Sequence, residues 1–417
     1  MSEAMPSAPL GELASMTMGQ SPDSGCVNHN EKGLPFLQGS AEFGARFPIA
    51  RIHCDPPLRV ARAGAALLSV RAPVGTMNRA DQDYCIGRGL AALLAKQGVA
   101  DNTFLVHAIE QNIDYLHRRS QGSTFLAIGS SDLSSMPVAA PPLAVQRRIA
   151  EILSTIDDAI AHTEALIAKT QAIKAGLMHD LFTRGVTPDG KLRPPREEAP
   201  HLYKQSPLGW IPKEWSVRSL SEFADVNRGK FSVRPRDDPR FYGGAYPFVQ
   251  TGDIALASGR TLTAFVQTLN EHGLVVSRLF PAGTIMVTIA ANIGDTCILG
   301  IPMCAPDSVV GVVPKKGEQG RFIELVIRRR KRWLESRAPQ TAQKNINLAD
   351  LKPLLVPYPG TLEQEQIAET YEAVDTELIA GESTLEKLCK LKSGLMHNLL
   401  SGRVRVPLPA ESREVTL

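Results

Sequence analysis

The chain has 417 residues, of which 43% are hydrophobic and 21% charged, so it is longer than one ordinary domain and its composition excludes a wholly disordered protein. Its net charge of +3 is too small to indicate nucleic-acid binding by itself. Residues 201–350 carry an excess of Lys and Arg, whereas residues 351–400 carry an excess of Asp and Glu, which favours two surfaces with different partners. No apolar run reaches the roughly 18 to 20 residues of a membrane span, and no secretory signal is recognisable, so we expect a cytoplasmic protein without membrane contact. The six cysteines form no CxxC pair. We therefore expect no metal site and no disulfide framework, and we expect the cysteines to be buried as apolar residues.

The predicted elements follow one another as two mixed fronts, each of which leads into a long helix. β-rich runs and helically spaced runs alternate within each front, which predicts an α/β (α+β) fold class. The runs are strands at 65–70 and 91–94 and a helix at 102–117 in the first front, and strands at 284–289 and 309–313 and a helix at 321–334 in the second. The expected segments are a front at 1–141, a long helix at 142–182, a linker rich in Pro, Gly and charge at 183–213, a second front at 214–353, a second long helix at 354–402 and a loose tail at 403–417.

The chain contains an internal duplication. Residues 146–181 match residues 364–399 at one constant shift of 218 positions, and both copies contain the run Gly-Leu-Met-His. The fronts match more weakly, at similar shifts. The matched positions include Gln146 and Gln364, Asp157 and Asp375, Lys174 and Lys392, and His179 and His397. The sequence therefore predicts two copies of one module, each a front followed by a helix.

The two long segments carry apolar residues at heptad spacing, which is typical of helices that pair along a seam. A helix of this length cannot bury its apolar stripe within one small domain, so we expect the two helices to pair with each other as an antiparallel coiled coil. The alternative is two separate core helices, one in each domain. The expected contact residues are Ile149, Leu153, Ile156, Ile160 and Leu177 in the first helix and Tyr371, Val374, Leu378, Leu385, Leu388 and Leu395 in the second.

No catalytic motif is recognisable in the sequence. There is no GxxxxGK[ST] phosphate loop, no GxSxG nucleophile motif and no HExxH metal motif. Residues 86–92 fit a GxGxxA pattern, which we interpret as a turn in a sheet, and residues 55–58 are similar to the DPP-aromatic motif of adenine methyltransferases but have Leu in place of the aromatic residue. His179 and His397 lie inside helical runs with no second base nearby, which favours a structural or subunit-contact role. We therefore predict no catalytic, metal-binding or cofactor-binding residue in this chain.

Cations and amides next to glycine turns favour contact with duplex DNA. Residues 328–332 place cations on two helical turns, which can neutralise phosphates, although the same run also suits a solvated helix face. Arg pairs well with guanine, and Asn or Gln with adenine, in the major groove. The candidate DNA-binding residues are Gln38, Arg71, Asn78, Arg79, Arg118 and Arg119 in the first front and Arg228, Lys230, Gln250, Thr251, Asn292, Arg328, Arg329, Arg330, Lys331, Arg332, Gln343, Lys344 and Asn345 in the second.

Together these features resemble the specificity subunit of type I restriction–modification enzymes over essentially the whole chain. The resemblance rests on the paired helix starts at 141–150 and 361–368 and on the paired helix ends, Lys-Ala-Gly-Leu-Met at 174–178 and Lys-Ser-Gly-Leu-Met at 392–396. It also rests on the run Pro-Leu-Gly-Trp-Ile-Pro-Lys-Glu-Trp at 207–215, which is similar to the start of the family's second recognition domain.

The resemblance implies a division of labour. Each front would be a target recognition domain that reads one half of a bipartite site in double-stranded DNA, and the antiparallel helices would set the spacer between the half-sites. Methyltransferase (modification) subunits would dock on the helical region, and a restriction/translocase subunit would join them. S-adenosylmethionine, ATP and Mg²⁺ would be bound by those partners, with no cofactor in this chain, which would be non-catalytic.

Two other classes of function remain open from the residues alone. One is a stand-alone adenine DNA methyltransferase with fused recognition domains, which would require a cofactor loop and an intact DPP-aromatic motif. The other is a duplicated protein–protein scaffold with no role on DNA.

Overall fold

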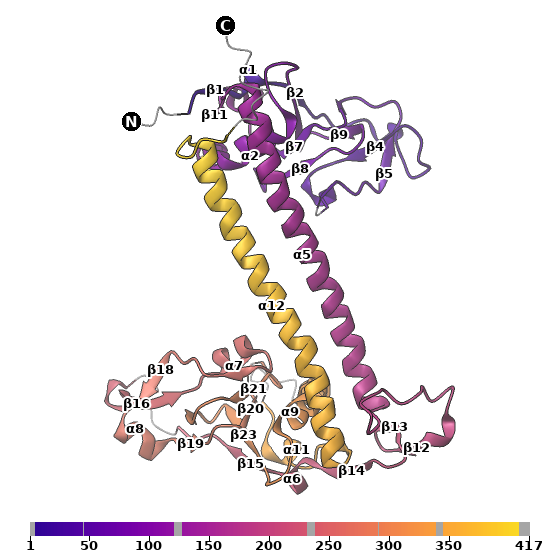
Figure 1. The fold of residues 1–417 in the computed structure, drawn as a ribbon, viewed down its shortest axis with the longest axis vertical. Helices are drawn as coiled ribbons and strands as arrows, with labels where there is room; N and C mark the ends of the chain where they lie inside the picture. The colour runs from indigo at the N-terminus through magenta and orange to yellow at the C-terminus, as the bar shows by residue number, and fades with distance from the viewer. Residues whose placement is uncertain are drawn as a thin grey trace. The chain divides into compact units, whose positions relative to one another are not determined.

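A computed structural model describes residues 5–44, 46–120, 127–231, 238–290, 292–338 and 345–407 of the chain (Figure 1). The chain divides into two compact units, unit 1 made of Met1–Lys169 with Ile379–Leu417 and unit 2 made of Thr170–Leu378. Each unit contains one front together with part of both long helices, α5 (Leu143–Thr183) and α12 (Thr361–Leu400). The expected tandem arrangement of two mixed fronts, each followed by a long helix, is confirmed.

The front of unit 1 is built from one antiparallel sheet, one mixed sheet and a group of short helices. One sheet has the strand order β2-β10-β7-β8 and the other β3-β5-β4-β9-β6, while β1 pairs with β11. The bounds are β1 (Ser7–Pro9), α1 (Leu10–Leu13), β2 (Ala14–Met18), β3 (Val27–Asn28), β4 (Leu34–Leu37), β5 (Ile52–Cys54), β6 (Val60–Ala61), β7 (Ala66–Ser69), β8 (Met77–Arg79), β9 (Tyr84–Ile86), β10 (Leu90–Ala95), α2 (Asn102–Gln111), α3 (Ile113–Ser120), α4 (Ser130–Ser134) and β11 (Pro137–Ala139).

The front of unit 2 repeats this plan, again with one four-stranded and one five-stranded sheet. One sheet has the order β15-β23-β20-β21-β17 and the other β18-β16-β22-β19, while β14 pairs with β24. The bounds are β14 (Ser216–Ser219), α6 (Leu220–Phe223), β15 (Ala224–Arg228), β16 (Tyr242–Phe248), α7 (Thr251–Ala257), β17 (Thr261–Leu262), β18 (Gln267–Leu269), α8 (Glu271–Val276), β19 (Arg278–Phe280), β20 (Ile285–Thr288), β21 (Thr296–Leu299), β22 (Met303–Ala305), β23 (Val309–Pro314), α9 (Gly320–Arg329), α10 (Lys331–Arg337), α11 (Leu348–Leu351) and β24 (Leu355–Tyr358).

The expected strands and helices are present in both fronts, with one difference. The helices expected at 102–117 and 321–334 are each broken near the middle, into α2 and α3 and into α9 and α10. Asn112 ends α2 and donates its side-chain amide to the carbonyl of Ala108 at 3.0 Å, and Arg330 ends α9 outside the regular helical conformation. Helical spacing continued through both breaks, so the periodicity of the sequence did not reveal them.

Glycine is required at one equivalent point in both fronts. A Cβ atom on Gly19 would lie 2.1 Å from the carbonyl oxygen of Gly87, and a Cβ atom on Gly229 would lie 2.1 Å from that of Pro306. Only glycine permits so close an approach of two backbones without a shift of one of them. The two fronts are therefore alike in backbone packing at a point where their sequences match weakly.

Each front is fixed to the helices through an apolar core. In unit 1, Phe104 and Leu105 of α2 share one core with Leu153 of α5 and with Met396 and Leu399 of α12. Full burial of one such side chain contributes about 1.5 to 3 kcal/mol. Unit 2 has the corresponding core, in which α9 shares apolar contacts with the end of α5 and the start of α12.

The two long helices contact each other within each unit. All eleven of the expected contact residues are buried or half-buried: Ile149, Leu153, Ile156, Ile160, Leu177, Tyr371, Val374, Leu378, Leu385, Leu388 and Leu395. Within unit 1, a Cβ atom on Gly381 would lie 3.2 Å from Ile167, and Lys392 contacts Asp157. A later residue of one helix thus meets an earlier residue of the other, which makes the pairing antiparallel.

The segment expected as a linker at 183–213 is more ordered than its composition suggested. It contains the hairpin of β12 (Tyr203–Ser206) and β13 (Gly209–Pro212), with Tyr203 and Ile211 buried. Of the expected loose tail, residues 408–417 lie outside the described residues, and Val406 is half-buried against the core of unit 1.

The cysteines are buried with two exceptions. Cys54, Cys85, Cys297 and Cys304 are buried, and burial raises the pKa of Cys54 to about 11 and that of Cys297 to about 12. The prediction was wrong for Cys389, which is exposed because it follows the seam residue Leu388 and faces away from the seam, and for Cys26, which is only half-buried.

Candidate nucleic-acid interface

The candidate residues of the first front divide into exposed groups and groups that the fold already uses. Gln38, Arg71, Arg79 and Arg118 are exposed and can reach a ligand. Two others have partners inside the front. The half-buried Asn78 donates to the carbonyl of Gly44 at 2.8 Å, and Arg119 forms an ion pair with Asp132 at 3.2 Å and lies over the ring of Tyr115.

The second front places several candidates around one loop. Arg228 donates through Nε to the carbonyl of Asp307 at 2.5 Å, and Arg278 donates to the carbonyl of Arg228 at 2.7 Å. Lys230 is exposed, and its backbone amide donates to Ala305 at 3.0 Å. The backbone of Asp307 thus holds the side chain of Arg228, the backbone of Arg228 holds the side chain of Arg278, and Lys230 is fixed beside them through its own backbone.

The remaining candidates of this front are scattered. Thr251 begins α7 and is half-buried, and Asn292 and Asn345 are exposed. Asn292 accepts through its backbone carbonyl from Thr288, and Asn345 forms a bridge with Ala290, so these two asparagines lie near each other. Gln343 and Lys344 lie outside the described residues.

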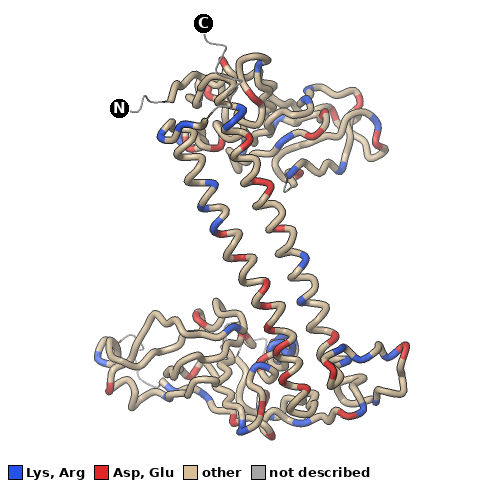
Figure 2. The backbone as a smooth tube through the Cα atoms, in the orientation of Figure 1, with Lys and Arg blue, Asp and Glu red and all other residues tan. Residues whose placement is uncertain are grey.

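Two cations of the run at 328–332 already have partners within unit 2. Arg328 contacts the buried Glu324 at 3.2 Å and donates to the hydroxyl of Tyr371 at 2.6 Å, and Lys331 pairs with Asp295 at 2.5 Å. Arg329, Arg330 and Arg332 have no carboxylate partner among the described residues. Figure 2 shows Lys and Arg gathered near the junction of α9 and α10.

Burial lowers the pKa of Arg329 and of Arg330, because these guanidinium groups lose water without gaining a counter-charge. A pocket of about 490 Å³ is lined by Arg328, Arg329, Lys331, Arg332 and Glu335. Arg330 lines a different pocket, together with Trp333 and Arg337.

Glu324 is a buried carboxylate that sequence reasoning missed. Its side chain is fully buried on α9 and contacts Arg321 at 3.3 Å and Arg328 at 3.2 Å, and Thr296 donates to it at 2.6 Å. Burial raises its pKa. The available signal was one acidic residue inside an otherwise apolar helical run.

Ion pairs at equivalent positions join the two long helices in both units. Lys174 pairs with Asp375 in unit 2, and Lys392 pairs with Asp157 at 3.0 Å in unit 1. The two lysines are equivalent in the repeat, and so are the two aspartates, so each copy supplies one lysine and one aspartate to the other copy. Lys392 also reaches Glu110 of the first front at 3.2 Å.

A repeated glutamine fixes each helix start to its front. Gln146 donates to the carbonyl of Pro141 at 2.8 Å and accepts from the backbone amide of Asp101 at 3.0 Å. Gln364 donates to the carbonyl of Pro359 at 3.2 Å and contacts the 318–319 turn of the second front. These glutamines matched in the repeat, but only the structure gives them a structural role.

The recurring histidines His179 and His397 have exposed side chains on the long helices. Among the described residues, no group of His, Cys, Asp and Glu is arranged to hold a metal ion. Within the same residues, the helices lack the combination of length and apolar character that would let one cross a membrane.

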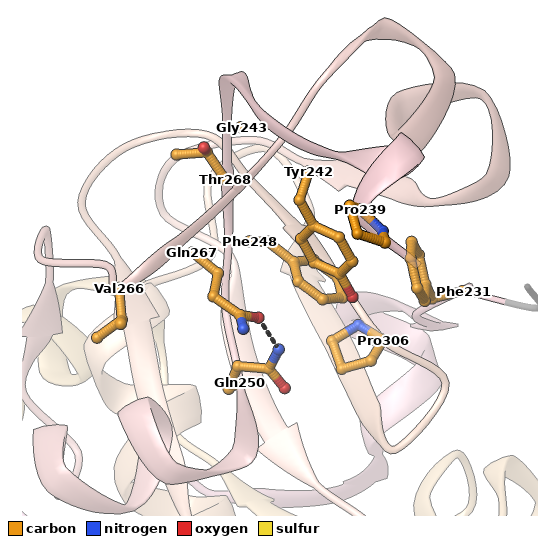
Figure 3. Close-up of a pocket in the computed structure, with 10 residues that line it drawn as sticks. All are labelled: Phe231, Pro239, Tyr242, Gly243, Phe248, Gln250, Val266, Gln267, Thr268 and Pro306. Carbon is orange, nitrogen blue, oxygen red and sulfur yellow. Dashed lines mark hydrogen bonds between the residues drawn. The ribbon is translucent and has the colours of Figure 1, made fainter. Parts of the chain in front are cut away.

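An open pocket of about 630 Å³ lies in the second sheet of unit 2 (Figure 3). The rings of Phe231, Tyr242 and Phe248 form one part of it, and the amides of Gln250 and Gln267 point toward each other in another part. Gln250 Nε2 donates to Gln267 Oε1 at 2.6 Å. Gln250 was a predicted site residue, whereas Gln267 was missed because nothing in the sequence around it distinguishes it.

Known proteins resemble this chain along most of its length. A family model described as the type I restriction modification DNA specificity domain matches residues 59–172 and 212–387. A Methanocaldococcus jannaschii protein, provisionally named the type I restriction enzyme MjaX specificity subunit, is 39% identical over 179 residues, covering 42% of this chain and 40% of that protein. The match therefore spans less than half of that relative's length.

Two further comparisons cover more of the chain. The type I restriction enzyme MjaVIII specificity subunit of the same organism is 24% identical over 348 residues, covering 76% of this chain and 73% of that protein. The solved S subunit of a type I restriction–modification system from M. genitalium has a TM-score of 0.65 at 16% identity, covering 95% of this chain and 96% of that one. The latter is a likeness of fold.

Proposed function

Because this chain belongs to the type I restriction modification DNA specificity family, we propose that it reads double-stranded DNA at a bipartite site, one half-site for each front. The observation that supports this most directly is that one recognition fold occurs twice, each time seated on the same pair of helices. Each copy also carries exposed cations and amides outside its core, among them Gln38 and Arg79 in the first and Lys230 in the second.

The chain acts in this proposal as a reader and a scaffold rather than as a catalyst. Methyltransferase subunits dock on the helical region, and a restriction/translocase subunit joins them. Those partners bind S-adenosylmethionine, ATP and Mg²⁺. The stand-alone methyltransferase is not favoured, because a leucine, Leu58, stands where that enzyme class carries an aromatic residue.

The proposal is tested by exchanging one front. Residues 214–353 are replaced by the corresponding segment of another family member, and the chimaera is produced together with methyltransferase subunits of a type I system that assemble with this chain. Sequencing of the methylated DNA is expected to show a change in one half-site while the other half-site stays as it was. A change in both half-sites, or in neither, would overturn modular reading.

The competing enzymatic function has its own test. The purified chain alone is incubated with duplex DNA and labelled S-adenosylmethionine. We expect no transfer of methyl groups until the methyltransferase subunits are added. Robust transfer by the chain alone would establish the methyltransferase instead.

A further inference from the structure

One glutamine occupies the same place in both fronts. Strand β4 runs parallel to β9 with Phe36 opposite Cys85, and strand β16 runs parallel to β22 with Phe248 opposite Cys304. Two residues after each of these phenylalanines stands a glutamine, Gln38 or Gln250. The fronts differ at most other positions, so this recurrence indicates a shared task at the end of the strand.

The backbone holds this position rigidly in unit 2. The amide of Gln250 donates to the carboxylate of Asp253 at 2.8 Å, and the amide of the preceding Val249 donates to Cys304 at 2.9 Å. The rings of Phe231 and Phe248 pack with their centroids 5.1 Å apart and line the pocket next to Gln250. A side chain that projects from such a position is placed with little freedom in its backbone.

The second amide is supplied by the neighbouring strand. Gln267 lies opposite Phe248 in the antiparallel pair of β16 and β18, and its side chain accepts the hydrogen bond of Gln250. Neither amide has a further hydrogen-bond partner among the described residues. Gln267 is exposed and Gln250 is half-buried, so the pair can be reached from solvent.

Two amides joined by one hydrogen bond leave the oxygen of one side chain free to accept and the NH₂ group of the other free to donate. This holds for either orientation of the amide groups, because turning both of them exchanges the roles of the two side chains and leaves the set unchanged. In the major groove, adenine presents the acceptor N7 beside the donor N6, which complements this set, whereas guanine presents two acceptors. Next to Gln267, the side chain of Val266 is 86% exposed and offers an apolar contact for the methyl group of thymine.

The surroundings suit a nucleic acid. Arg228, Lys230 and Arg278 are exposed and are held by the backbone of residues 228 and 305–307, part of which lines the same pocket. Cations beside the pocket that contains the two glutamines can contact phosphates. Such contacts position the duplex without reading its sequence.

We propose that Gln250, held by Gln267, reads an adenine in the half-site bound by the second front. This inference rests on the proposed function and adds the residue and the base. The first front differs at the second position, because Ile52 lies opposite Phe36 where Gln267 lies opposite Phe248. Gln38 therefore has no amide partner at that place, and the paired reading belongs to the second front.

The test uses the chain together with its methyltransferase subunits in a host without other DNA methylation, and the modified motifs are read by sequencing. The half-site of the second front is expected to contain an adenine for which Gln250→Ala reduces the preference about tenfold. Gln250→Glu, which keeps the size of the side chain, is expected to shift the preference toward cytosine, because a carboxylate accepts from cytosine N4. Gln267→Ile, which copies the first front, should weaken the same position and no other.

Gln205→Ala is the matched control, because Gln205 is an exposed glutamine on β12 of the same unit, and it should leave the motif unchanged. If the Gln250 variants methylate the same motif with the same preferences, the inference is wrong while half-site recognition stands. If the unaltered chain with its partners yields no bipartite motif, the proposed function fails and the inference fails with it.

Discussion

The ion pair between Lys174 and Asp375 offers a direct test of how the two helices hold their register. The side chains are only 18% and 16% exposed, and Lys174 also lies over the ring of Tyr371 at 5.0 Å. Both charges are therefore largely removed from water. Removing one partner of such a pair costs about 3 to 5 kcal/mol, because the other charge stays buried without compensation.

Lys174→Met removes the charge and keeps most of the apolar stem. Asp375 would keep only the more distant Arg260, whose Nε lies 3.9 Å away. Because the pair retains some contact with water, we expect the lower end of the range, a loss of about 3 kcal/mol in the free energy of unfolding. At roughly 1.4 kcal/mol for each factor of ten, this corresponds to more than a hundredfold change in the folding equilibrium.

The double variant Lys174→Met with Asp375→Leu allows the interaction between the two residues to be measured apart from the contacts that each makes with its surroundings. Replacing both charges by apolar groups is often neutral, since no buried charge is left. We expect the double variant to recover most of the loss, with a coupling energy of at least about 2 kcal/mol in the double-mutant cycle. Urea unfolding monitored by circular dichroism measures all four proteins.

The exposed pair Lys390 and Glu386 on α12 is the matched control, with side chains 74% and 66% exposed. Its removal should leave the unfolding midpoint where it was, because exposed ion pairs contribute little. Strictly additive effects of Lys174→Met and Asp375→Leu would refute the reasoning, since two residues that do not interact show no coupling.

Three further outcomes follow from the same contacts. Glu324→Gln should lower the free energy of unfolding by about 3 kcal/mol in urea denaturation, because Arg321 and Arg328 lose their buried counter-charge. Burial acts to raise the pKa of Glu110, but His107 and Lys392 outweigh it and hold the pKa below its usual value, so its contribution is present above the usual glutamate pKa and is lost as pH falls through the lowered value. Thermal unfolding of Glu110→Gln should accordingly depend less on pH between about 5 and 3 than that of the unaltered chain. Inserting one heptad at matched points of both long helices lengthens each by about 10 Å, and the methylated motif should gain about three base pairs of spacer with both half-sites unchanged.

The sequence predicted the helices well because their pattern is local and repeated. Helical periodicity predicted both long helices without knowledge of what they pack against, and β-rich runs between glycines marked the buried strands. Neither signal depends on contacts between distant parts of the chain.

Other features could not be predicted from the sequence, because they depend on residues that come close only in the folded chain. The run at 328–332 showed its charges in the sequence, and helical spacing places Glu324 four residues before Arg328 on the same helix face. The carboxylate that pairs with Lys331 is Asp295, which is distant in the sequence, and nothing local reveals that it is close. Gln267 escaped for the same reason, since it gains significance only from the strand that pairs with β18.

The pairing of Lys174 with Asp375 and of Lys392 with Asp157 also explains why the helices match in the repeat while the fronts diverge. Each lysine meets the aspartate of the other copy, so a change in one helix has to suit a residue in the other helix. Among the described residues, no ion pair of this kind joins a strand of either front to the other copy. A front can therefore change side chains on its sheets, as it does at the equivalent position occupied by the half-buried Ile52 and the exposed Gln267, without disturbing the helix pair. If each front reads its own half-site, as we propose, the two fronts are free to differ, provided that the helices stay alike.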